Sequence, residues 1–223
     1  MTALTPPVQE QTSENLGSIF DMIIDGGPLM IPIGLCSIVA LAYVVERTVR
    51  LSPAALGSRG FQRDLLREVE SGGVAKALDF CERAKNSLSR VLAAGFKRAD
   101  APTLEMEKAV EDAGAREVRK LSANLRPLVV VGMIAPLLGL LGTVWGMIQA
   151  FQNIALRDAI GKPELLAAGI SQALITTAAG LAVAIPTQAA YYYFRARIDR
   201  FVRQTETLFV DVTEAVAPRG KAA

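Results

Sequence analysis

The sequence has no histidine, and among its 223 residues there are only two cysteines and one tryptophan. Without histidine the chain cannot form a Ser-His-Asp or Cys-His catalytic arrangement, or a histidine-ligated zinc or haem site. Cys36 lies in an apolar segment and Cys81 in a charged one, so we predict packing roles for both, with no disulfide or metal site. With 6% aromatic residues and a net charge of +2, nothing indicates nucleic-acid binding.

Charge is absent from three long segments, residues 26–45, 127–156 and 165–194. At about 1.5 Å per helical residue, each is long enough to cross a hydrocarbon core about 30 Å thick. Uncharged windows of this length are rare in water-soluble proteins, so three buried helices of a soluble protein are the weaker interpretation. We predict an all-α integral membrane protein with three transmembrane helices.

The distribution of charge around these segments predicts their orientation. Residues 1–25 contain four acidic side chains and no Lys or Arg, whereas residues 47–126 contain 16 basic and 11 acidic side chains. The segment after the third span begins with four arginines within nine residues. By the positive-inside rule, the N-terminus lies outside, while residues 47–126 and the C-terminal tail are cytoplasmic. Because the first apolar window starts late and is full length, we expect an uncleaved span and not a signal peptide.

The expected organisation alternates spans with polar segments. It comprises an outer N-terminal segment (1–27), the first span (28–46), a cytoplasmic helical domain (47–126), the second span (127–153), an outer hairpin (154–164), the third span (165–194) and a cytoplasmic C-terminal helix and tail (195–223). Apolar residues at helical spacing over 16–24 predict a short amphipathic helix that lies on the outer interface or packs against the bundle.

The cytoplasmic domain has a helical pattern. Residues 61–96 predict two or three amphipathic helices broken at Gly72-Gly73. Residues 103–126 meet the second span without a loop signal, so we expect one long helix, bent at Pro127, to run from the cytoplasm into the membrane. Long helices are thus predicted to extend from the membrane into the cytoplasmic domain.

Small and polar residues form stripes on the second and third spans. At 100° per residue, those of the second span fall within an arc of roughly 80°. The predicted packing or partner-facing seam comprises Gly132, Pro136, Gly139, Gly142, Gly146, Ala173, Gly180, Ala184 and Pro186, and threonines at 143, 176 and 177 lie on or beside it. Such stripes let helices approach closely, with threonine hydroxyls bonding back to their own helices, or they line a polar path. Two matching stripes favour a shared polar seam.

The three uncharged windows contain no Asp, Glu, Lys, Arg or His that could relay a proton. A residue of that kind is costly in a membrane and marks function where it occurs. If the protein handles protons, a partner must supply the carboxylate. Pro136 and Pro186 each free a backbone carbonyl that a partner, water or an ion could use.

Residues 134–147 (IAPLLGLLGTVWGM) and 170–186 (ISQALITTAAGLAVAIP) resemble the second-span and third-span signatures of the ExbB/TolQ family, which is related to the MotA motor subunits. A weaker resemblance runs through residues 26–30, Glu46-Arg47 and the cytoplasmic helices. The resemblance therefore covers nearly the whole chain and is most specific in the two spans.

This resemblance implies a multi-pass protein of the bacterial inner membrane that forms a homopentamer around the single-span helices of an ExbD- or TolR-like partner. That partner carries a membrane Asp, and the proton motive force drives work that is passed to a periplasm-spanning protein of the TonB or TolA kind. Thr143 and Thr177 match the family's two pore-facing threonines, and Gln172 and Thr176 complete the candidate ion path. ExbB-type members often have Glu at the position of Gln172, so a proton-relay role for that side chain is lost here.

The sequence therefore predicts a non-enzymatic subunit of an ion-driven motor in biopolymer transport, with no cofactor. The alternative is a membrane scaffold that uses the same seams only for helix packing. A self-contained transporter is less favoured, because the spans carry no charge and no inverted repeat. An enzyme is less favoured still, because no nucleophile-base pair can be proposed. The Exb or Tol subfamily, the cargo, the stoichiometry with the partner and the choice of proton or sodium stay open.

Overall fold

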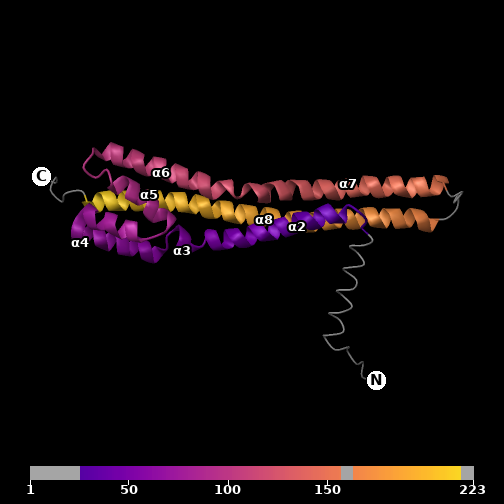
Figure 1. The fold of residues 1–223 in the computed structure, drawn as a ribbon, viewed down its shortest axis with the longest axis horizontal. Helices are drawn as coiled ribbons and strands as arrows, with labels where there is room; N and C mark the ends of the chain where they lie inside the picture. The colour runs from indigo at the N-terminus through magenta and orange to yellow at the C-terminus, as the bar shows by residue number, and fades with distance from the viewer. Residues whose placement is uncertain (1–25, 157–162, 217–223) are drawn as a thin grey trace, which may run out of the picture. The chain divides into compact units, whose positions relative to one another are not determined.

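A computed structural model of the chain describes residues 26–156 and 163–216, which contain helices and turns and no strand (Figure 1). The helices are α2 (Met30–Arg50), α3 (Pro53–Leu56), α4 (Arg59–Arg83), α5 (Ser87–Phe96), α6 (Thr103–Ala123), α7 (Arg126–Leu156) and α8 (Pro163–Val216). The all-α prediction is confirmed. The expected amphipathic helix at 16–24 and half of the expected outer hairpin lie outside the described residues.

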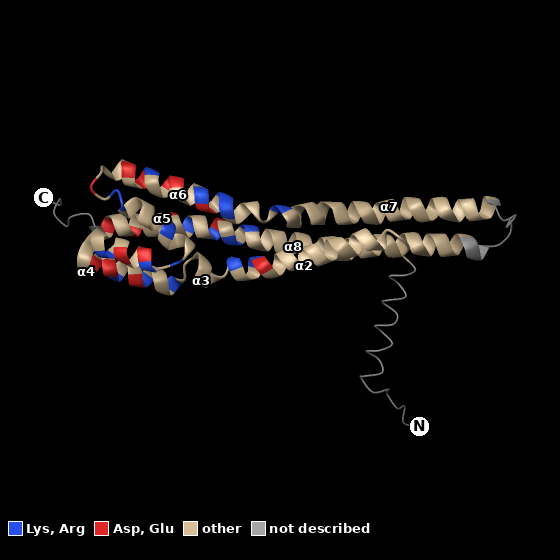
Figure 2. Cartoon of the chain, viewed as in Figure 1, with Lys and Arg blue, Asp and Glu red and all other residues tan. Residues whose placement is uncertain are grey.

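The chain divides into two compact units. The membrane unit contains the described residues up to Ala42 together with Pro127–Ala189, and the second unit contains Tyr43–Arg126 and the described residues from Ala190 onward. Charged side chains gather on α4, α6 and the C-terminal part of α8, whereas α7 is almost free of them (Figure 2). Within the described ranges, three helical segments are long and apolar enough to cross a membrane, as the three uncharged windows predict.

The C-terminal half of α8 has large apolar residues spaced three or four positions apart, which is the pattern of an amphipathic helix. Large apolar residues recur along one face and are buried in the second unit, at Phe194, Ile198, Phe201, Leu208 and Val212. Arginines fall between them on the outer face, so burying one face does not bury charge. The same unit buries apolar residues of α5, and the side chain of Asn86 caps α5 by accepting from the N–H of Ser89 at 2.7 Å.

Helix α4 bends where its sequence has two consecutive glycines. Gly73 has φ +67, a left-handed conformation that a Cβ disfavours, and Gly72 is also non-helical. The predicted break at Gly72-Gly73 is therefore confirmed.

The prediction of one continuous helix bent at Pro127 is wrong. Helix α6 ends at Ala123, a turn follows, and Pro127 is the second residue of α7. The proline ring would clash with the carbonyl of Ala123, four residues earlier, and proline has no N–H to donate to it. In the first turn of a helix that N–H is not needed, so Pro127 starts α7 instead of bending α6.

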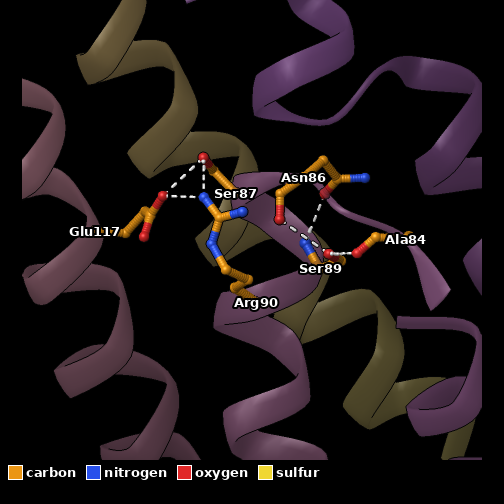
Figure 3. A network of polar contacts seen from close by, with 6 residues as sticks. All are labelled: Ala84, Asn86, Ser87, Ser89, Arg90 and Glu117. Atoms are coloured by element: carbon orange, nitrogen blue, oxygen red, sulfur yellow. Dashed lines mark hydrogen bonds and ion pairs between the residues drawn. The ribbon is translucent and has the colours of Figure 1, made fainter. Parts of the chain in front are cut away.

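A polar network joins α5 to α6 in the second unit (Figure 3). Ser87 donates a hydrogen bond of 2.9 Å to Glu117, and Arg90 donates to the same carboxylate oxygen. Burial of Glu117 by itself would raise its pKa. The hydrogen bonds from Arg90 and Ser87 and the charges of Arg90 and Lys120 outweigh this, so the pKa of Glu117 lies below its ordinary value.

This network predicts that Glu117→Gln destabilises the chain in a pH-dependent way. Because the folded-state pKa of Glu117 is lowered, its stabilisation is complete above the unfolded pKa of about 4.3 and is lost as pH falls through the folded value. We expect a loss of about 1.5–3 kcal/mol at neutral pH, as for hydrogen bonds to charged groups. Thermal or urea unfolding followed by circular dichroism, at neutral pH and below about pH 4, measures both values.

The matched control is Glu111→Gln, which removes one exposed carboxylate from the same helix. Glu111 makes no ion pair within residues 26–156 and 163–216. Its loss should change stability by less than about 0.5 kcal/mol. If Glu117→Gln behaves like this control, or if its effect does not shrink in acid, the role assigned to the network is wrong.

Candidate functional site

The site is built where α7 and α8 run side by side in the membrane unit, with glycines at the points of closest approach (Figure 1). A Cβ added to Gly139 would lie 3.1 Å from the Cα of Thr177 on α8. A Cβ added to Gly180 would lie only 2.6 Å from the carbonyl oxygen of Ala135 on α7. Each glycine thus leaves space that the backbone of the other helix occupies, which is how small residues let helices associate in membranes.

The structure brings most of the predicted seam together within one chain. Gly132, Gly139, Gly142, Gly146, Ala173, Gly180 and Ala184 are all buried. Gly142 lies against the side chain of Thr176, and Gly132 lies against that of Gln188. Pro136 is half-buried, whereas Pro186 is exposed and does not join the buried seam. Gly169 belongs to the contact although it was not predicted, since a Cβ there would lie 3.1 Å from the carbonyl oxygen of Gly146.

Thr177 ties the two helices together at their closest approach. Its hydroxyl donates a hydrogen bond of 3.0 Å to the carbonyl oxygen of Gly139. Thr143, the other threonine matched to the pore-facing positions, donates instead to Leu140 on its own helix at 2.7 Å. The two candidate ion-path residues therefore have different surroundings, one bonded across the seam and the other bonded within α7.

Thr176 and Gln172 connect α8 to the turn that precedes α2. The Thr176 hydroxyl is buried and lies 3.0 Å from the carbonyl oxygen of Gly26 and 2.7 Å from that of Gln172, so two acceptors share its one proton. The Gln172 side chain packs on Gly27, where φ is +72 and a Cβ would lie 2.0 Å from the amide nitrogen. Sequence reasoning missed Gly26 and Gly27 as contacts of α8, although a Gly-Gly-Pro turn before a span is a signal for such a close approach.

Gln172 also lines a pocket between α7 and α8. This cavity has a volume of about 400 Å³, and its polar walls come from Gln149, Asn153, Ser171 and Gln172. Amides and a hydroxyl can bond water or a hydrated ion, but they cannot release or accept a proton near neutral pH. No cluster of residues able to hold a metal ion occurs in the part of the chain that the structure describes.

Large apolar side chains cover the outer faces of the membrane unit. Leu137, Leu140 and Val144 on α7 are about half exposed, as are Leu174 and Ile185 on α8. A surface of this kind is stable against lipid tails or against further helices. The single chain therefore has room for neighbours on both α7 and α8.

The comparisons with known proteins match the same region. A model of the MotA/TolQ/ExbB proton channel family matches residues 83–207. An ExbB-like biopolymer transport protein of Synechocystis is 34% identical over 170 residues, which is 75% of this chain and 66% of the relative. The Tol-Pal system protein TolQ of Pseudomonas aeruginosa is 35% identical over 60% of this chain and 62% of the relative. TolQ of Haemophilus influenzae is 29% identical over 78% and 81%.

The chain thus spans slightly less than two thirds of the first two relatives. The family match, however, covers more than half of this chain and includes α6, α7 and most of α8. The second and third uncharged windows, 127–156 and 165–194, and the close α7–α8 contact lie inside it. This chain belongs to the MotA/TolQ/ExbB proton channel family, whose ExbB and TolQ members are inner-membrane proteins.

Proposed function

We propose that this chain is a subunit of an inner-membrane, ion-driven motor that energises outer-membrane or envelope transport. In this proposal it forms a homopentamer around an ExbD- or TolR-like single-span partner and passes work to a TonB- or TolA-like protein. The observation that carries the proposal is a membrane unit with a hydrogen-bonding seam and no Asp, Glu, Lys, Arg or His in its uncharged windows.

The absence of Asp and Glu from the uncharged windows supports a partner that supplies a carboxylate. Moving a proton through the membrane requires a group that binds and releases it, and the threonines and glutamines of α7 and α8 do neither near neutral pH. A partner helix with a membrane Asp would complete the path beside Thr143 and Thr177. The exposed apolar faces of α7 and α8 offer the surface that neighbouring copies and a partner helix would cover.

A scaffold without ion conduction is the second candidate, and a specific observation favours it. The hydroxyls of Thr143, Thr176 and Thr177 all donate to backbone carbonyls, so each already has a structural partner. The glycines of the seam are likewise accounted for by packing within one chain. The two candidates differ in whether the threonine hydroxyls are needed for energised transport.

The experiment that tests the proposal is native mass spectrometry of the complex extracted from its own host membrane. We expect five copies of the 23.8 kDa chain together with at least one small single-span subunit that has a transmembrane Asp. Proteoliposomes of this complex should take up protons when a gradient is applied, and replacing the partner's Asp by Asn should abolish the flux. A homo-oligomer that never retains such a subunit would exclude the motor and favour the scaffold.

A further inference from the structure

A pocket of about 700 Å³ lies between the N-terminal turns of α4 and the C-terminal part of α8, entirely within the second unit. Four arginines line it, two from each helix: Arg59 and Arg63, and Arg200 and Arg203. Among the described residues, Asp211 is the single acidic side chain on its wall. Four positive charges against one negative charge leave a net of +3 in a concave site, so the pocket is complementary to an anion.

The four arginines have no carboxylate partner within residues 26–156 and 163–216. Other arginines of the same two helices do have one, since Arg67 pairs with Asp64 at 3.8 Å and Arg195 pairs with Asp199 at 3.5 Å. Guanidinium groups that share a pocket repel one another unless an anion lies between them. Arginine binds phosphate well, because its planar fork can donate two parallel hydrogen bonds to phosphate oxygens.

Two further features of the pocket favour an anionic acceptor. The side-chain nitrogen Nε2 of Gln62 is buried in the pocket wall and has no acceptor among the described residues. A buried donor without an acceptor is unfavourable, and a turn of the Gln62 side chain toward the pocket would give this nitrogen a ligand oxygen as its acceptor. The pocket also lies at the start of α4, where the helix dipole is positive and Ser58 caps only the N–H of Phe61.

We propose that this pocket is a binding site for a phosphate-bearing anion. The chemistry it recognises is a phosphate group with at least two free oxygens, donated to by arginines of both α4 and α8 and by Gln62. That group can belong to a soluble phosphate compound or to the headgroup of an anionic phospholipid. By holding α4 against α8, the ligand stabilises the second unit, and binding weakens as salt screens the arginines.

The test uses the full-length protein in nanodiscs made of phosphatidylcholine, with inorganic pyrophosphate as the probe in isothermal titration calorimetry. The pocket variant carries Arg63→Gln and Arg200→Gln. The control variant carries Arg67→Gln and Arg195→Gln, which remove the same charge from the same helices outside the pocket. We expect the pocket variant to bind pyrophosphate at least about tenfold more weakly, and the control to stay within about twofold of wild type.

A second arm distinguishes the two sources of phosphate. In nanodiscs that contain phosphatidylglycerol, a lipid-headgroup site predicts that pyrophosphate is displaced and that native mass spectrometry finds the lipid retained by wild type and control and lost from the pocket variant. A site for soluble phosphate predicts unchanged pyrophosphate binding in these discs. If the pocket and control variants, both folded by circular dichroism, bind both probes equally, or if wild type binds neither, the proposal is wrong.

Discussion

Gly180→Leu should prevent α7 and α8 from packing and should give the largest loss of stability of any substitution in the seam. A Cβ at Gly180 would lie 2.6 Å from the carbonyl oxygen of Ala135 and 3.1 Å from the Cα of Gly139. Both are backbone atoms, so no side-chain rotation can relieve the contact and the helices must move apart. Overpacking typically costs about 1–3 kcal/mol, and a backbone clash belongs at or above the upper end of that range.

The measurement is the thermal unfolding midpoint and the monodisperse yield of the purified protein in detergent. Gly180→Ala should show a smaller loss in the same direction, because the Cβ alone already clashes. The matched control is Gly34→Leu on α2, where an added side chain meets nothing within 4 Å. A Gly180→Leu variant with the midpoint and yield of this control would show that α7 and α8 do not approach as described.

Thr177→Val should strongly lower partner-dependent energised transport while the complex still assembles. The substitution keeps the shape of the side chain and deletes the hydroxyl, which donates to Gly139 at 3.0 Å. Interhelical hydrogen bonds in membrane proteins contribute about 0.6 kcal/mol on average, so folding should survive. In the proposed motor, the oxygen of the Thr177 hydroxyl also contacts the moving ion. Removing this oxygen from a poorly solvated path should lower transport by about tenfold or more.

The readout is energised uptake in cells that contain the partner subunits, normalised to the amount of assembled complex. Thr187→Val is the matched control, because Thr187 is also buried on α8 and its hydroxyl donates to the carbonyl oxygen of Val183 in the same helix, at 2.7 Å. Thr177→Ser, which keeps the hydroxyl, should restore uptake. Wild-type uptake by Thr177→Val would mean that the hydroxyl serves packing alone, and it would favour the scaffold.

The membrane spans and the close approach of two of them could be predicted from the sequence, because both depend on composition along the chain. Absence of charge decides which segments can enter a membrane, and the helical period decides which side chains share a face. The sequence therefore places Gly139 and Gly180 on one packing seam, and the structure brings the two into contact. The break at Gly72-Gly73 was predictable for a similarly local reason, since glycine readily adopts the conformation found there.

Only the tertiary structure decides which hydrogen-bond partner each polar side chain has. Periodicity places Thr177 and Thr176 on neighbouring faces of one helix, but it does not say that the first reaches Gly139 and the second reaches Gly26. These partners are far away along the chain, and differences of a few tenths of an ångström in the donor–acceptor distance decide whether a hydrogen bond forms. The role of Pro127 also depends on where α6 ends. The residues of α6 favour a helix up to and beyond Ala123, so their composition does not reveal this end.

The arginine pocket shows most clearly what the sequence determines and what the tertiary structure decides. From the sequence alone, both arginine pairs fall in segments with an excess of positive charge, which are predicted to be cytoplasmic. Only the fold brought Arg59 and Arg63 of α4 beside Arg200 and Arg203 of α8. Local pattern determines elements and their faces, because these depend on neighbouring residues. The meeting of distant side chains is decided by how those faces pack, because packing alone determines which distant atoms lie within bonding distance.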